Sequence, residues 1–117
     1  MKFKNMFSPI QIGPMTVKNR FVVPPMGNNF ANSDGTWSDE SVAYYGERAK
    51  GQFGLITIEA TVVHKGAKGG PKKPCLYDDN SIESLKKITD ACHEEGAKVS
   101  IQLQNAGPEG NAKNAGA

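Results

Sequence analysis

The chain has 117 residues, of which 38% are hydrophobic and 22% are charged, as in soluble globular domains. Its 14 basic and 12 acidic side chains are interspersed, so the net charge of +2 forms no basic face for nucleic acid. Cys75 and Cys92 lack a zinc-binding spacing, and no apolar run reaches the ~18 residues that cross a bilayer. We therefore expect a cytoplasmic protein with reduced thiols, no metal site, no membrane contact and no nucleic-acid partner.

Two β segments are predicted at the start of the chain. Ile10–Ile12 and Met15–Val17 flank the turn pair Gly13-Pro14, which is typical of a small hairpin. Residues 20–26 form a continuous apolar run that predicts a strand buried on both faces. Its end is marked by Pro24-Pro25, because proline cannot donate to a strand ladder.

A helix with two marked ends follows, and then a second strand. Ser38 stands at the N-cap position and acidic residues occupy the first turn, where the helix dipole favours them. Basic residues fill the last turn before Gly51, so a helix is predicted over 39–50. Residues 54–63 are rich in β-branched side chains and predict the second strand.

The second half of the chain predicts a loop, a helix and a third strand. Residues 64–74 lack apolar periodicity and indicate an exposed loop, including its four lysines, Lys65, Lys68, Lys72 and Lys73. Asn80 or Ser81 caps the next helix, with Glu83 completing a capping box. One helix face is apolar, and it comprises Ile82, Leu85, Ile88, Ala91 and Cys92. After Gly96, residues 98–103 form a strand, and the tail after Gln104 has no helix.

The order of these elements defines an α/β protein. The core strands begin near Phe21, Gly54 and Val99, about 33 and then 45 residues apart, which predicts parallel βαβ units. An open nucleotide-binding sheet would place a GxGxxG turn after the first strand, and none is present. In a (β/α)8 barrel, functional groups gather at the carboxyl ends of the strands. In this chain, the first strand ends with a proline and a glycine. The second strand ends near a carboxylate, Glu59, and the third near an amide, Gln102.

Three segments resemble the Old Yellow Enzyme family, in particular its NADH:flavin oxidoreductase, enoate and 2,4-dienoyl-CoA reductase branch. They read FSPIQIGPMTVKNRFVVPPMG, YYGERAKGQFGLITIEAT and IQLQNAG, in family order. The resemblance implies that residues 1–117 are the amino-terminal part of one FMN-binding TIM-barrel domain: the opening hairpin and three strands alternating with two helices, a truncated barrel. It also implies reduction of activated C=C bonds in an enone, enoate or enoyl thioester, with NAD(P)H as electron donor. Longer relatives carry 4Fe-4S and FAD groups in parts that these residues do not include.

The resemblance also implies which residues contact FMN. The backbone of Pro25, Met26 and Gly27 would line the isoalloxazine ring, Ala60 would approach its polar edge, and Gln102 would hydrogen-bond the pyrimidine end. A glutamine amide has donors and an acceptor, which suit the N–H and C=O groups of a flavin. The catalytic residues of the family fall outside these 117 residues, so none is assigned, and the isolated chain is expected to be inactive and to bind FMN weakly.

Gly27 departs from the family, which often has Cys or Thr at this position. A glycine offers only its backbone, so we expect a flavin of lower potential than in such relatives. The alternative is that the backbone needs a positive φ or that a bulky substrate must pass. Asn105 and Pro108 depart from a second family motif that carries histidine and arginine.

Other interpretations remain open at this point. The chain could be part of a different (β/α)8 enzyme, or a non-catalytic subunit that needs a partner chain, the remainder of the barrel or another copy to close the sheet. For Glu59, pairing with a lysine or arginine is expected ahead of any catalytic role.

Overall fold

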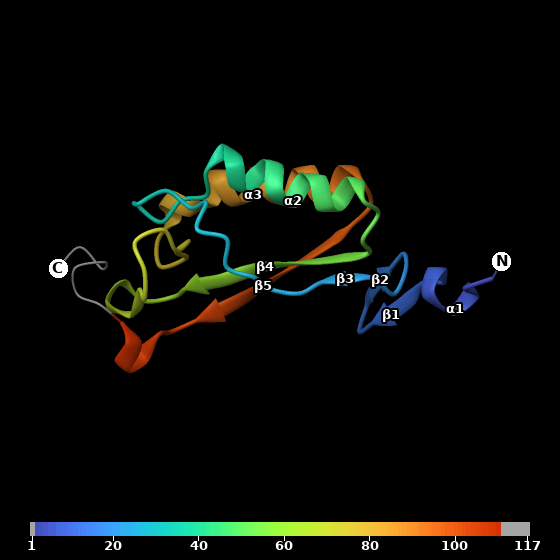
Figure 1. The fold of residues 1–117 in the computed structure, drawn as a ribbon, viewed down its shortest axis with the longest axis horizontal. Helices are drawn as coiled ribbons and strands as arrows, with labels where there is room; N and C mark the ends of the chain where they lie inside the picture. The colour runs from blue at the N-terminus through green and yellow to red at the C-terminus, as the bar shows by residue number, and fades with distance from the viewer. Residues whose placement is uncertain (1, 111–117) are drawn as a thin grey trace.

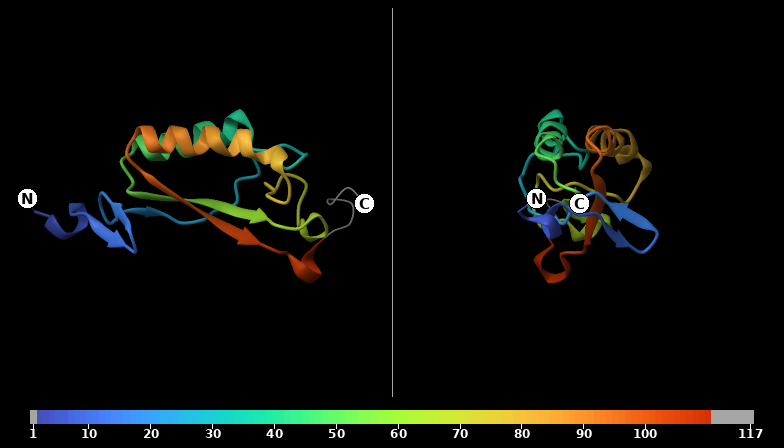
Figure 2. Two further views of the ribbon diagram at one scale, coloured as in Figure 1. Left: turned by 180° about the vertical axis from the view of Figure 1, so that it is seen from behind. Right: turned by 90° about the vertical axis from the view of Figure 1, so that its right-hand side faces the viewer.

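The computed structural model describes residues 2–110, which form a three-stranded parallel sheet with two helices on one face (Figures 1 and 2). A two-stranded hairpin and a short helix lie at the amino-terminal end. The helices and strands are α1 (Lys4–Phe7), β1 (Ile10–Ile12), β2 (Met15–Val17), β3 (Val22–Val23), α2 (Asp39–Lys50), β4 (Leu55–Val62), α3 (Ile82–Glu94) and β5 (Lys98–Gln104). The sheet order is β3-β4-β5, as the opening of a (β/α)8 barrel requires.

The hairpin β1-β2 is antiparallel and confirms the predicted turn, whereas α1 was not predicted. The predicted strand over residues 20–26 is wrong in extent, since only Val22 and Val23 pair with β4 before the two prolines. It is also wrong in burial. Val23 is buried beneath the helices, but Val22 is 47% exposed on the other face, which no described element covers.

The two helices begin differently. The Ser38 hydroxyl caps α2 by accepting the Ser41 N–H at 3.2 Å, which confirms the prediction for that helix. The capping box predicted for α3 is wrong. The Ser81 side chain makes no cap bond, because its hydroxyl donates to the Cys75 carbonyl. A 3₁₀ turn (Asp79–Ser81) leads into α3 instead, and Asp78 accepts its Asn80 N–H at 2.9 Å.

The core lies between the sheet and the helices. Its buried residues come from β3, β4, both helices and their connections: Val23, Trp37, Tyr45, Ala49, Ile56, Ile58, Ile88, Cys92 and Ala97. The apolar face predicted for α3 is confirmed at Ile88 and Cys92 and wrong at Ile82, which is 57% exposed. Between β4 and β5, Thr57 and Ser100 hydrogen-bond through their hydroxyls at 2.7 Å.

The segment 64–74 is not the fully exposed loop that its composition predicts. It contains a 3₁₀ turn (Lys65–Ala67), and Lys68 is only 3% exposed, with its Nζ donating to the Ser33 carbonyl at 3.0 Å. Its end returns to the sheet, where the Val62 N–H donates to the Pro74 carbonyl at 2.9 Å. Packing against the end of β4 outweighs the polar composition of this segment.

The tail after β5 also differs in part from the prediction. A 3₁₀ turn (Gly107–Glu109) follows the strand, where no helix was expected. The rest of the predicted tail, residues 111–117, lies outside the described residues.

Candidate active site

The carboxyl ends of β3, β4 and β5 lie at one edge of the sheet, because all three strands are parallel (Figure 1). In barrels of this class that edge carries the reactive groups. The five residues that the sequence assigned to FMN belong to these three strand ends: Pro25, Met26, Gly27, Ala60 and Gln102.

A β-bulge shapes the end of β4. Ile58 pairs with Ile101 and Thr61 pairs with Leu103, so Glu59 and Ala60 together oppose the single residue Gln102. A bulge leaves one residue out of the regular ladder and bends its strand, and bulges are over-represented beside active sites. It therefore places Ala60 opposite Gln102 and interrupts the pairing there.

Glu59 is fully buried at this bulge. The Tyr45 hydroxyl, from α2, donates to its Oε1 at 3.4 Å, and the Asn28 N–H donates to its Oε2 at 3.2 Å. Burial raises the pKa of the Glu59 carboxyl, and the Asn28 N–H and the charge of Lys73 act in the opposite direction. The expectation of an ion pair at Glu59 is wrong, because the partners of its carboxylate are a phenol and a backbone amide.

The Asn28–Glu59 hydrogen bond joins the segment after β3 to the end of β4. Gly27, immediately before it, is exposed and does not adopt a positive φ. A Cβ added at Gly27 would lie 3.0 Å from Nζ of Lys73, whose stem passes close to Gly70. The positive-φ explanation for this glycine is therefore wrong, and the space beside it holds a lysine ammonium.

Several polar groups at this edge have no partner among the described residues. Gln102 and Met26 are exposed, and the Gln102 side chain makes no hydrogen bond within the described part of the chain. A free amide, a glycine without a side chain and a bulged backbone can together meet the N–H and C=O groups of the ring. None of the five predicted residues is buried in the core, so all remain available to a ligand.

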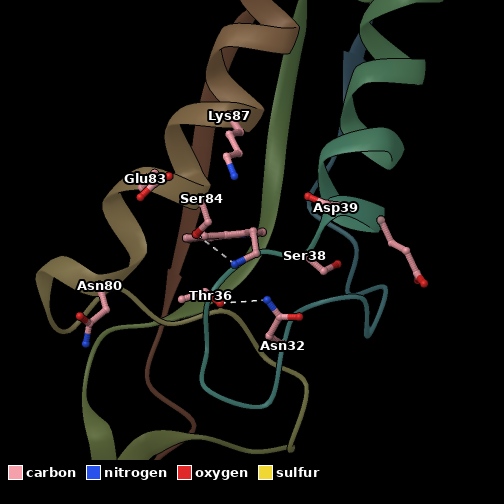
Figure 3. Close-up of a pocket in the computed structure, with 10 residues that line it drawn as sticks. Asn32, Thr36, Ser38, Asp39, Asn80, Glu83, Ser84 and Lys87 are labelled. Carbon is pink, nitrogen blue, oxygen red and sulfur yellow. Dashed lines mark hydrogen bonds between the residues drawn. The ribbon is translucent and has the colours of Figure 1, made fainter.

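A separate cavity of about 560 Å³ lies in the helical layer, between the amino ends of α2 and α3 (Figure 3). Three carboxylates line it, those of Asp39, Glu40 and Glu83, and Lys87 is its one basic residue. The acidic lining opposes the binding of a phosphate, and the cavity includes none of the residues at the strand ends.

No helix among residues 2–110 is long and apolar enough to span a membrane. Within the same range, no group of three His, Cys, Asp or Glu side chains could hold a metal ion.

Comparison with known proteins identifies the family of the chain. Residues 5–116 match the model of the NADH:flavin oxidoreductase / NADH oxidase family. A 2-naphthoyl-CoA reductase in complex with 2-naphthoyl-CoA is 33% identical, with a TM-score of 0.91 over 97% of this chain and 17% of its own. The old yellow enzyme from Trypanosoma cruzi is 34% identical, with a TM-score of 0.88 over 97% of this chain and 30% of its own. An old yellow enzyme homologue from Zymomonas mobilis is 31% identical, with a TM-score of 0.88 over 97% of this chain and 31% of its own.

The fold thus matches the opening of the TIM barrels of these relatives. The chain belongs to the NADH:flavin oxidoreductase / NADH oxidase family, which includes the Old Yellow Enzymes. It spans less than a third of the length of these three relatives.

Proposed function

We propose that this chain forms the first three strands of an FMN-dependent reductase of activated C=C bonds, with NAD(P)H as electron donor. The observation that carries the proposal is the convergence of Gly27, Ala60 and Gln102 at one sheet edge, in a chain that belongs to a flavin oxidoreductase family. The substrate class is an α,β-unsaturated carbonyl compound: an enone, an enoate or an enoyl thioester. One relative is described with 2-naphthoyl-CoA bound, and another, a morphinone reductase, with tetrahydroNAD.

Each strand end has its own part in holding the cofactor. The backbone of Pro25, Met26 and Gly27 would line the ring, Ala60 would approach its polar edge through the bulged backbone, and Gln102 would hydrogen-bond the pyrimidine end. FMN, when bound, would supply hydride transfer from NAD(P)H to the β-carbon of the substrate, and a proton from solvent would complete the saturated product at the α-carbon.

The uncovered face of the sheet bears on what completes the site. Val22, on the face away from the helices, is 47% exposed, which is a cost in water that further protein would remove. Barrel strands outside this chain cover this face best, because the parallel strands continue the barrel geometry. A second copy of the chain is the alternative cover.

The test is cofactor binding and turnover by the protein that contains these residues. We expect one FMN per chain by visible absorbance, bleaching of that absorbance by NADH or NADPH without oxygen, and its return on addition of an enone or enoate. The saturated product, identified by mass spectrometry, completes the test. A colourless protein that gains no absorbance with added FMN would contradict the proposal.

A further inference from the structure

Lys73 is the charged group closest to the glycine that distinguishes this chain at the end of β3. Its Nζ lies 3.0 Å from the position that a Cβ on Gly27 would take. An alanine there would already crowd the ammonium, and a threonine or cysteine would displace it. The lack of a side chain at Gly27 and the position of Lys73 are therefore two parts of one arrangement.

The backbone beside Lys73 is anchored at the end of β4. The next residue, Pro74, accepts the Val62 N–H at 2.9 Å, and Cys75 forms a parallel bridge with Val62. The Cys75 thiol also donates to the Lys73 carbonyl at 3.4 Å. Lys73 itself is half-buried, and the backbone that follows it is held at the end of β4.

The charge of Lys73 has no direct partner in the described part of the chain. Both ion pairs found there, Lys50 with Glu47 and Lys86 with Asp90, lie on the helices. The carboxyl whose charge Lys73 influences is Glu59, but the contacts of Glu59 are the Tyr45 hydroxyl and the Asn28 N–H. A half-buried ammonium without a paired carboxylate is available to another anion.

We propose that Lys73 supplies, in the space that Gly27 leaves open, the cationic group that faces the bound flavin and stabilises its reduced, negatively charged form. This rests on the proposed function, since it requires FMN at the strand ends. With this lysine in place, we no longer expect the low flavin potential that Gly27 alone implies. Lys73, from the β4–α3 connection, occupies the space of the missing side chain. A cation held near the ring favours added electrons, and partial burial strengthens that attraction relative to water.

The experiment is the flavin midpoint potential of the FMN-loaded protein, measured by anaerobic spectroelectrochemical titration. In Lys73→Met we expect the two-electron reduction equilibrium to shift at least tenfold toward the oxidised form, which is about 30 mV. Lys73→Arg keeps the charge and should stay within about threefold of the wild type. Lys72→Met is the matched control, because it removes the same charge from an exposed neighbour, and it should also stay within about threefold.

Gly27→Ala tests the arrangement without removing the lysine. In Gly27→Ala, the added Cβ should displace Nζ and lower the flavin potential. Adding Lys73→Met to this variant should lower the potential by less than Lys73→Met lowers it in the wild type. Equal potentials in wild type and Lys73→Met, or equal shifts in Lys73→Met and Lys72→Met, would overturn the proposal. If Lys73→Met does not fold, an unchanged potential in Gly27→Ala overturns it. Absence of FMN from the wild-type protein would refute the proposed function and this inference together, whereas bound FMN with unchanged potentials refutes only the role of Lys73.

Discussion

Tyr45 and Glu59 are joined by two hydrogen bonds between α2 and the end of β4. The Tyr45 hydroxyl accepts the backbone N–H of Glu59 at 3.0 Å and donates to its carboxylate at 3.4 Å. Both residues are almost fully buried, so water cannot replace either bond. This contact fixes the helix against the β-bulge that carries Ala60.

Replacing Tyr45 with phenylalanine should therefore destabilise the protein. The change leaves a buried N–H without its partner and a carboxylate with one donor fewer, which costs about 1–3 kcal/mol of unfolding free energy. Urea unfolding followed by circular dichroism measures it. Tyr44→Phe is the control, because Tyr44 is only half-buried and its hydroxyl makes no hydrogen bond within the described residues. Equal losses in the two variants would show that the contact contributes nothing.

Glu59 should make the stability depend on pH. Burial raises its pKa in the folded protein above the ordinary value of 4.5, so the folded state holds the proton more tightly than the unfolded state. Stability from this group is greatest at low pH and falls as the pH rises from about 4.5 through the raised pKa, above which it is level.

Glu59→Gln isolates this contribution. Subtracting the unfolding free energy of the variant from that of the wild type should give a difference that falls with rising pH and then levels. Glu83→Gln is the control at an exposed carboxylate. A difference for Glu59→Gln that is flat or rises across this range would show that burial does not raise the pKa of Glu59.

Two glycines should respond in opposite ways to alanine. At Gly54, a Cβ would lie 2.7 Å from Val17 Cγ1 and 2.9 Å from the Asn19 carbonyl oxygen, so Gly54→Ala should cost about 1–3 kcal/mol. At Gly46, inside α2, the nearest atom would be Ala91 Cβ at 3.8 Å, and alanine should add up to about 1 kcal/mol through its better helix propensity. Thermal unfolding of the two variants compares them directly. A stable Gly54→Ala protein would mean that the hairpin does not pack against the start of β4.

Gln102→Leu should weaken FMN binding in the holoprotein. The flavin's pyrimidine groups would lose a hydrogen-bond partner worth about 1–3 kcal/mol, or roughly 5-fold to 150-fold in the dissociation constant. Fluorescence titration with FMN measures this constant. Gln104→Leu makes the same change two residues along β5, beyond the bulge, and should leave binding nearly unchanged. An unaltered constant in Gln102→Leu would remove Gln102 from the cofactor site.

The sequence by itself determined the order of the hairpin, the three core strands and the two long helices. The caps of α2 are local signals, because Ser38 and the charged end turns act within a few residues of one another, and the predicted bounds match the structure. The β-branched run of β4 and the proline pair after β3 likewise act locally. The resemblance of three segments to the family then predicted which strand-end residues contact FMN.

Only the tertiary structure decided which side chains lie beside the strand ends. Lys73 and Gly27 are 46 residues apart in sequence and meet because the β4–α3 connection folds back onto the sheet. Composition alone predicted a solvated side chain for Lys68, whereas packing buries it. Glu59 hydrogen-bonds to Tyr45 on α2 and not to the expected cation. Such contacts depend on which distant segments the fold brings together. Side-chain type and spacing along the chain do not directly indicate these long-range contacts.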